Sequence, residues 1–194
     1  MKQSNCQLDS SETEIIINQL KAVLANNVNG DVVEFGCYDG ATSIQLAKAI
    51  SGSGRKLYVY DSFEGLPAKT NNDISPVGEQ FQPGELLVSK KQFIKNIQKA
   101  NVCMPIIKKG WFCDLSNADV PARICFAFLD GDYYESIIDS FKLIEGNLSS
   151  GAVIVVDDYM NDALPGAKKA VDGWLSQKKY RMSVKNSLAI INVL

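Results

Sequence analysis

Short apolar segments that alternate with helical segments constrain the fold of this chain more than any other feature. Strand-like runs are expected over residues 31–35, 56–60, 105–108, 124–130 and 153–157. Segments with a helical spacing of apolar residues are expected over residues 41–50, 85–100, 135–147 and 165–177. Strands and helices that alternate in this way predict a mostly parallel sheet with helices on both faces.

The last two strand-like segments narrow this prediction. They cover residues 180–184 and 188–193, and only Lys185, Asn186 and Ser187 separate them. So short a link permits an antiparallel hairpin but no helical crossover. We therefore expect the α/β, doubly wound, Rossmann-like sheet of class I methyltransferases, mostly parallel with one antiparallel strand at the C-terminal hairpin. Dinucleotide dehydrogenases usually keep the sheet parallel throughout.

The chain is expected to form a single domain over residues 1–194, because its length and hydrophobic content of 46% suit one core. Residues 1–30 are interpreted as an N-terminal helical segment that begins with a capping box from Ser11 to Glu14. Residues 66–84 are rich in Pro, Asn and Gly and lack periodicity, so we expect a lid loop there.

Charge and residue usage exclude several classes of function. The net charge of -2 lacks the basic excess that phosphate contacts require, so no nucleic-acid partner is expected. The apolar runs are too short to cross a bilayer and no signal peptide is evident, which favours a cytoplasmic protein without a membrane partner. Five cysteines without a CxxC spacing suggest reduced thiols. Histidine is absent, which rules out imidazole bases and histidine metal ligands.

Two acidic clusters close two of the predicted strands. Asp130 and Asp132 flank Gly131 after one apolar run, and Asp157 and Asp158 follow another. Open α/β sheets bind ligands at their strand ends, and carboxylates gathered there repel one another unless a cation or protons offset the charge. The clusters therefore predict a metal site. Neighbouring strand residues point to opposite faces, so we expect a turn at Asp157 and Asp158. Helix and turn capping by these aspartates is the alternative.

The loop from Glu34 to Gly40 follows the first strand and carries glycines four residues apart. It lacks the GxGxxG pattern of dinucleotide sites, and Tyr38 and Asp39 crowd the place of a pyrophosphate. A sulfonium nucleoside with an amino-acid tail suits this loop better, because Glu34 and Asp39 attract positive charge. Asp61 ends the second strand, where a carboxylate can accept both ribose hydroxyls. A tight turn with a capping Asp61 remains the alternative.

Several longer motifs resemble the macrocin O-methyltransferase family. They are Asp61-Ser62-Phe63-Glu64-Gly65-Leu66-Pro67, Lys109-Gly110-Trp111-Phe112, Leu129-Asp130-Gly131-Asp132-Tyr133-Tyr134-Glu135-Ser136, Val156-Asp157-Asp158-Tyr159 and Pro165-Gly166-Ala167-Lys168-Lys169-Ala170-Val171. The resemblance runs from about Val32 to Trp174. It implies S-adenosylmethionine as the methyl donor, Mg²⁺ or another divalent cation, and a small-molecule hydroxyl acceptor such as the sugar of a natural product.

The resemblance also implies a role for individual residues. Asp130, Asp157 and Asp158 would bind the metal, and Asp132 would be the catalytic base. Cofactor-binding residues would be Glu34, Gly36, Cys37, Tyr38 and Gly40 at the methionine end, Asp61 and Ser62 at the ribose, and Gly110 and Trp111 around the adenine. A homodimer is one assembly that the sequence allows.

This chain differs from the family pattern in two places. Only about thirty residues precede the first strand, where many relatives have a longer segment that covers the acceptor, and Phe128 stands where relatives often have histidine. Three interpretations remain open: a metal-dependent O-methyltransferase, a fold-related metal enzyme of other chemistry such as hydroxylation, and a non-catalytic cofactor-binding module. Intact Glu34, Gly36, Gly40 and Asp61 favour the first over the second, and intact Asp130, Asp157 and Asp158 favour it over the third.

Overall fold

The computed structural model describes residues 9–78 and 81–194. Within them, seven strands form one sheet in the order β3-β2-β1-β4-β5-β7-β6. The strands are β1 (Asp31–Phe35), β2 (Leu57–Asp61), β3 (Ile106–Lys109), β4 (Ile124–Leu129), β5 (Leu148–Val156), β6 (Arg181–Lys185) and β7 (Leu188–Asn192). Strand β7 runs antiparallel to its neighbours, β5 and β6, and the other described strand pairs are parallel. The predicted sheet and its C-terminal hairpin are therefore confirmed.

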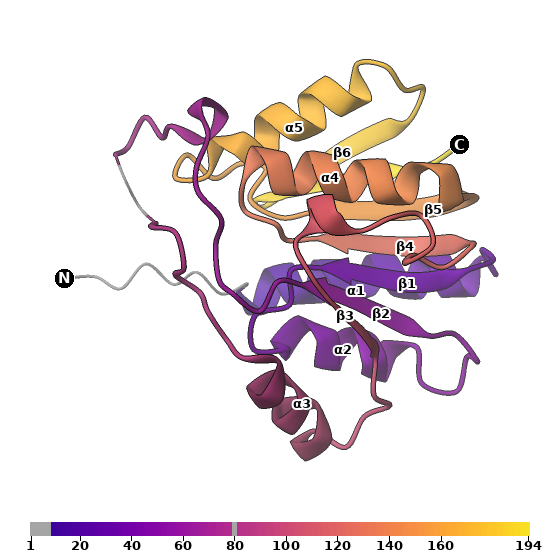
Figure 1. The fold of residues 1–194 in the computed structure, drawn as a ribbon. Helices are drawn as coiled ribbons and strands as arrows, with labels where there is room; N and C mark the ends of the chain where they lie inside the picture. The colour runs from indigo at the N-terminus through magenta and orange to yellow at the C-terminus, as the bar shows by residue number, and fades with distance from the viewer. Residues whose placement is uncertain (1–8, 79–80) are drawn as a thin grey trace.

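Helices cover both faces of this sheet (Figure 1). The α-helices are α1 (Ser10–Ala25), α2 (Ala41–Ala49), α3 (Lys90–Lys99), α4 (Tyr134–Ile144) and α5 (Pro165–Leu175), and short 3-10 turns are η1 (Asn71–Asp73), η2 (Phe112–Asp114) and η3 (Glu145–Asn147). In Figure 1, α4 and α5 lie in the upper part of the view and α2 and α3 in the lower part, and the two core clusters place the first pair on one face of the sheet and the second pair on the other. No helix among residues 9–78 and 81–194 is both long and apolar enough to cross a membrane.

The central strand β4 shows how the sheet divides the core in two. All six of its residues are buried. Phe126 and Phe128 belong to the cluster that α1, α2 and α3 cover, and Ala127 and Leu129 belong to the cluster under α4 and α5. Successive strand residues point to opposite faces, so a strand covered on both sides appears in the sequence as a continuous apolar run.

Several boundaries differ from those predicted, and three of these differences bear on the local structure. Helix α3 begins at Lys90 and not at residue 85, because Glu85 bonds to the backbone of Leu66 and Leu86 has a positive φ of 59°. Strand β5 begins at Leu148, five residues earlier than expected. The capping box of α1 joins Asp9 and Glu12, not Ser11 and Glu14. Of the predicted N-terminal helical segment, residues 1–8 lie outside the described residues.

The loop predicted over residues 66–84 is closed at its base by the backbone. The Gly84 amide donates to the Leu66 carbonyl at 2.8 Å, and the Leu66 amide donates to the Glu85 carbonyl at 2.8 Å. Residues 79 and 80 of this predicted lid lie outside the described residues. The described part extends from the end of β2 to the start of α5 (Figure 1). We call residues 66–84 the covering loop.

Candidate active site

The sheet reverses its winding between β1 and β4, which is where open α/β sheets form a ligand crevice beyond the carboxyl ends of the strands. A cavity of about 220 Å³ opens there between the loops that follow β1, β2, β3 and β4. Its walls include eight of the residues selected from the sequence: Gly36, Cys37, Tyr38, Asp61, Ser62, Trp111, Asp130 and Asp132. The expected cofactor loops and the first acidic cluster therefore share one cavity.

Five other selected residues are not part of the cavity wall: Glu34, Gly40, Gly110, Asp157 and Asp158. Glu34 is buried beneath the wall at the end of β1, and Gly40 lies against the side chains of Phe93 and Ile97 of α3. Gly110 donates its amide to the Asp61 carbonyl at 3.0 Å. These contacts place Glu34, Gly40 and Gly110 next to the segments that form the site, outside the cavity wall.

Left-handed backbone is concentrated around this site. A non-glycine residue with positive φ occurs in the loop after each of four parallel strands: Tyr38 after β1, Phe63 after β2, Asp132 after β4 and Asp158 after β5. Such residues cost on the order of 1–3 kcal/mol each, and they cluster where function requires a fixed local geometry. The four strand ends therefore share a kind of backbone geometry that is common at functional sites.

Gly36 allows the loops after β1 and β4 to meet. Its φ is 84°, and a Cβ atom at this position would lie 1.9 Å from the carbonyl oxygen of Asp130. The Asp130 amide in turn donates to the Phe35 carbonyl at 2.8 Å. Any side chain at position 36 would force apart the cofactor loop and the first acidic cluster.

Asp61 joins the loops after β1 and β2. Its carboxylate accepts the Cys37 amide at 2.9 Å and the Phe63 amide at 2.6 Å. Asp61 therefore caps the turn that follows it, as the alternative interpretation of the sequence expected. Each carboxylate oxygen has a second lone pair, however, and Asp61 also forms part of the cavity wall, so it can accept ligand hydroxyls as well.

Glu34 is a fully buried carboxyl group. Its Oε2 accepts a hydrogen bond from the Ser43 hydroxyl, whereas Oε1 has no hydrogen-bond partner among the described residues. Burial raises the pKa of Glu34 to about 8, although the Ser43 hydrogen bond opposes the shift. A buried oxygen without a partner requires an explanation, and a positively charged ligand group would provide one.

The acidic cluster brings together three aspartates from two strand ends. Asp130, Asp132 and Asp158 each place a carboxylate oxygen within 4.8 Å of the others. Burial raises the pKa values of Asp130 and Asp132 well above the ordinary range, and repulsion from neighbouring carboxylates adds to the shift. Burial also raises the pKa of Asp158 to about 6. A divalent cation would relieve this repulsion, and its preferred ligands are oxygens of this kind.

Asp157 lies beside this group without being one of its three members. Its Oδ1 accepts the Asp158 amide at 2.8 Å and the Ser187 hydroxyl at 3.3 Å. Burial and repulsion from Asp130 raise the pKa of Asp157, so the two carboxylates still interact. The turn predicted after Val156 is present. The fold thus groups Asp132, the expected base, with two of the three expected ligands.

Simple capping does not explain the first acidic cluster. The cap residue of α4 is Tyr133, whose side chain makes no capping hydrogen bond, and the amide of Tyr134 donates instead to Asp73 of the covering loop. Neither Asp130 nor Asp132 is needed to begin α4. Capping of α4 therefore does not account for these two aspartates.

Several cavity residues were not selected from the sequence. Phe112 and Cys113 line the wall from η2, and Glu135, Ser136 and Asp139 line it from α4. Glu135 and Asp139 are four residues apart, which places both on one face of a helix. That spacing, directly after an acidic strand end, is the signal that could have identified them.

The chain matches the family model described as Macrocin-O-methyltransferase (TylF) over residues 13–190. It is 32% identical over 153 residues to the 8-demethyl-8-(2,3-dimethoxy-alpha-L-rhamnosyl)-tetracenomycin-C 4'-O-methyltransferase of Streptomyces olivaceus, covering 74% of this chain and 58% of that protein. The chain spans between 58% and 63% of the length of the curated relatives it matches.

Solved structures show the same fold. The O-methyltransferase NovP superposes with a TM-score of 0.77 and 25% identity, covering 93% of this chain and 78% of that one. An O-methyltransferase from Bacillus cereus in complex with SAH superposes with a TM-score of 0.68 and 13% identity, covering 98% of this chain and 84% of that one.

Proposed function

Because the chain belongs to the Macrocin-O-methyltransferase (TylF) family, we propose that it transfers a methyl group from S-adenosylmethionine to a hydroxyl group of a small molecule. One observation carries this proposal. A single cavity contains both the loops after β1 and β2, which suit a nucleoside with an amino-acid tail, and the acidic residues after β4. Methyl donor and acceptor must meet in one place for a direct transfer.

The residues present fit S-adenosylmethionine. The unpartnered Oε1 of Glu34 is buried at the end of β1, and the carboxylate of Asp61 lies in the cavity wall. In the proposal, Glu34, Gly36, Cys37, Tyr38 and Gly40 hold the methionine end, Asp61 and Ser62 bind the ribose, and Gly110 and Trp111 surround the adenine. S-adenosylhomocysteine, the product, would occupy the same residues.

The acidic residues fit a divalent cation, and we assign Mg²⁺ to Asp130, Asp157 and Asp158. Three carboxylates at two adjacent strand ends provide hard oxygen ligands and leave positions open for two acceptor oxygens, for which a vicinal diol is suited. A cation bound there would lower the pKa of an acceptor hydroxyl. Asp157 is included because its carboxylate interacts with that of Asp130 and lies next to Asp158 in the turn.

Asp132 is the proposed general base. It lines the cavity and lies within the acidic group, so its carboxylate is available to an acceptor hydroxyl in the same space. It takes the hydroxyl proton as the oxygen attacks the methyl carbon and the bond from that carbon to sulfur breaks. Placement of the two reactants provides most of the acceleration, up to about 7–11 kcal/mol in favourable cases.

The acceptor that we propose is a sugar hydroxyl of a natural product. The name of the Streptomyces olivaceus relative describes methylation of such a sugar, and a second relative, at 27% identity, is named mycinamicin III 3''-O-methyltransferase. A sugar offers adjacent hydroxyls, which match the open positions expected at the cation. We also propose a cytoplasmic location, which suits the free thiols of Cys37, Cys103, Cys113 and Cys125. A homodimer stays a prediction that light scattering can test.

A methyl-transfer assay tests this function. The full chain is incubated with methyl-labelled S-adenosylmethionine and a panel of glycosylated natural products, with Mg²⁺ or with EDTA. We expect label in at least one sugar-containing acceptor and its loss in EDTA. Label that appears equally with EDTA would contradict the metal-dependent mechanism, and an absence of S-adenosylmethionine binding would contradict the whole proposal.

A further inference from the structure

Asp73 is a buried carboxylate in the middle of the covering loop, and only 2% of its surface is exposed. Its Oδ2 accepts the amide of Thr70 at 2.9 Å and the hydroxyl of Thr70 at 2.8 Å. Its Oδ1 accepts the amide of Tyr134, the first residue of α4, at 2.7 Å. One side chain therefore ties the covering loop to the segment that follows the first acidic cluster.

Helix α5 also packs against this carboxylate. A Cβ atom at Gly166 would lie 1.9 Å from Oδ1 of Asp73, so the first turn of α5 approaches closely where only glycine fits. Residues in the first turns of α4 and α5 thus both lie against the Asp73 carboxylate, and a helix N-terminus favours a negative charge. Lys169 of α5 adds a second tie by donating to the Asn72 carbonyl at 2.6 Å. These contacts explain how a carboxylate can be buried at this position.

The segment held by Asp73 contains a strained residue. The Tyr133 amide donates to the Gly131 carbonyl at 2.6 Å, which closes a γ-turn around Asp132, whose φ is 58°. A γ-turn with positive φ at its centre is the rarer and more strained form. A strained residue keeps its conformation only when the structure on both sides fixes it. Before Asp132, that constraint comes from β1, because the Asp130 amide donates to the Phe35 carbonyl at 2.8 Å.

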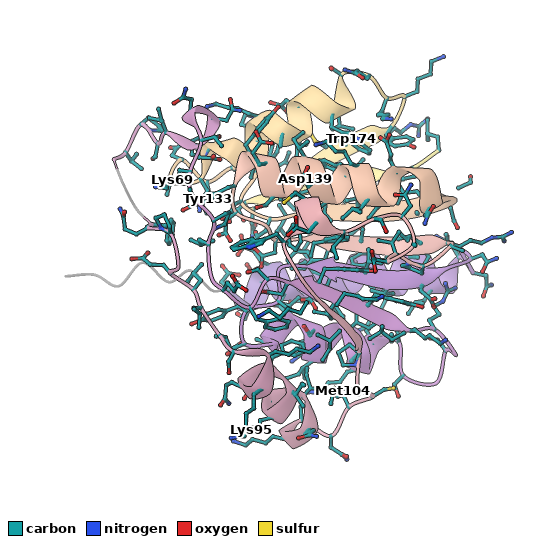
Figure 2. The ribbon with its side chains drawn as sticks, in the orientation of Figure 1. Lys69, Lys95, Met104, Tyr133, Asp139 and Trp174 are labelled. Carbon is teal, nitrogen blue, oxygen red and sulfur yellow. The ribbon has the colours of Figure 1, made fainter. Side chains whose placement is uncertain are left out.

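After Asp132, the constraint comes from the covering loop. Tyr133 is 1% exposed and packs with Leu66, Phe81 and Leu164. Figure 2 shows Tyr133 beside Lys69 of the loop, whose ammonium nitrogen lies 5.9 Å from the centre of the Tyr133 ring. The bond from the Tyr134 amide to Asp73 completes this attachment.

We propose that Asp73 is a positioning residue of the active site, which holds Asp132 in its strained conformation through the Tyr134 amide. The same contact fixes the covering loop, whose base residues Leu66 and Pro67 line the cavity. The role given to Asp132 rests on the proposed function. The mechanical link from Asp73 to Asp132 does not, and it can be measured in the absence of any ligand.

The test compares two substitutions at one position with a matched control in the full chain. Asp73→Ala removes every acceptor, and Asp73→Asn keeps one acceptor oxygen for the Tyr134 amide. Ser75→Ala is the control, because Ser75 ties the same loop to the Asp162 carbonyl at 2.7 Å without reaching α4. Hydrogen–deuterium exchange over residues 131–137 is followed in the metal-free proteins. Calorimetric titrations with Mn²⁺ and, separately, with S-adenosylhomocysteine follow.

We expect the backbone amides of residues 131–137 to exchange at least about tenfold faster in Asp73→Ala than in the wild type. The amides of β4 should exchange at an unchanged rate. We expect the affinities of Asp73→Ala for Mn²⁺ and S-adenosylhomocysteine to change by less than about twofold, because Asp132 is the proposed base and not a proposed ligand. In Asp73→Asn the amides of residues 131–137 should exchange up to about threefold faster than in the wild type, and Ser75→Ala should match the wild type. A merely structural role would speed exchange in β4 as well and would weaken both ligands.

Unchanged exchange over residues 131–137 in Asp73→Ala would overturn the proposal. So would an equal increase in exchange over residues 131–137 in Ser75→Ala. Should Asp73→Ala fail to fold, Asp73→Asn decides alone: exchange that increases over residues 131–137 and not in β4 supports the proposal, and exchange that is unchanged or increases equally in both segments contradicts it. A wild-type protein that binds neither Mn²⁺ nor S-adenosylhomocysteine contradicts the proposed function, while the exchange result still decides the role of Asp73.

Discussion

Asp132 belongs to the acidic cluster and Asp157 lies beside it, and substitutions at the two positions should have different effects. Asp132→Asn removes the proposed base, so we expect turnover to fall by about 10²–10⁴-fold while Mg²⁺ affinity changes little. Asp157→Asn removes a proposed ligand, so Mg²⁺ affinity should fall along with turnover. Calorimetry with Mg²⁺ and a methyl-transfer assay give both quantities for each variant.

The opposite pattern would support a different assignment. If Asp132→Asn abolished Mg²⁺ binding and Asp157→Asn preserved it, the cation would lie between Asp130, Asp132 and Asp158, the three carboxylates that approach within 4.8 Å. Asp139→Asn is a suitable control, because Asp139 lines the same cavity from α4 outside the acidic cluster.

Glu34 should make cofactor affinity depend on pH. Burial raises its pKa to about 8, so in the cofactor-free protein the group is largely protonated at neutral pH. A cationic ligand group favours the charged carboxylate, and binding below about pH 8 should therefore release a proton. We expect S-adenosylmethionine affinity to rise as the pH increases towards about 8, and Glu34→Gln to lose that dependence.

Calorimetry in two buffers of different ionisation enthalpy measures this proton release. Ser43→Ala offers a partial control, since it removes the hydrogen bond that lowers the pKa of Glu34. It should therefore shift the pH dependence upward without abolishing it. Equal binding enthalpies in both buffers for the wild type would show that Glu34 does not meet the charged end of the ligand.

The residues that the sequence identified share one property: they stand directly beside a strand end. Acidic residues such as Asp61, Asp130 and Asp158 are conspicuous because an apolar run precedes each of them. Asp73 had no such context, being one acidic residue in an aperiodic loop. Its partners, Tyr134 and Gly166, are 61 and 93 positions away in the chain, so only the folded structure reveals its role.

At the level of elements, α3 supports both cofactor loops. Phe93 of α3 is fully buried, its ring lies 5.8 Å from that of Phe63 after β2, and it leaves no room for a side chain at Gly40 after β1. We expect Phe93→Ala to lower the free energy of unfolding by about 3–5 kcal/mol. Because both loops lose their support, S-adenosylmethionine affinity should also fall, by about tenfold.

Leu20→Ala provides the comparison, since Leu20 is equally buried in α1, a helix that packs on α2, β4 and β5. Its cavity should cost about 2–5 kcal/mol without a matching loss of cofactor affinity. Denaturant unfolding and calorimetry measure the two effects. Equal losses of affinity in both variants would mean that general destabilisation, and not the contact with α3, weakens binding.

Element boundaries were harder to predict than the elements themselves. The apolar residues Leu86, Leu87 and Val88 resemble the start of a helix, yet the backbone bond between Glu85 and Leu66 keeps this segment out of α3. Strand β5 continues back to Leu148 through Ser149, Ser150 and Gly151, whose polar character concealed it. In both cases a contact with a distant segment overrides the local pattern.

For the whole molecule, carboxyl groups with raised pKa values predict an unusual pH dependence of stability. The pKa of Glu34 is raised to about 8 and that of Asp158 to about 6, and those of Asp130, Asp132 and Asp157 are raised as well. The native protein therefore holds more protons than the unfolded chain above about pH 4. The stability from these groups is complete below their unfolded pKa values and is lost as the pH rises towards about 8.

Mg²⁺ should oppose the loss of stability at higher pH, because it binds the deprotonated carboxylates. We expect the Tm of the metal-free protein to fall between about pH 5 and pH 8, and Mg²⁺ to raise Tm more at the higher pH. Calorimetric melting with Mg²⁺ or EDTA measures both effects. A Tm that rises with pH in EDTA would contradict the raised pKa values of these carboxyl groups. Ca²⁺ and Mn²⁺ are the comparison cations.

The central claim is that one cavity at the switch point of the sheet binds S-adenosylmethionine next to a metal site, and calorimetric titration of the cofactor tests it most directly. The full chain is titrated with S-adenosylmethionine in EDTA and again in Mg²⁺. We expect one site per chain in both conditions, with the site lost in Asp61→Ala. A failure of the wild-type chain to bind S-adenosylmethionine in either condition would contradict the claim.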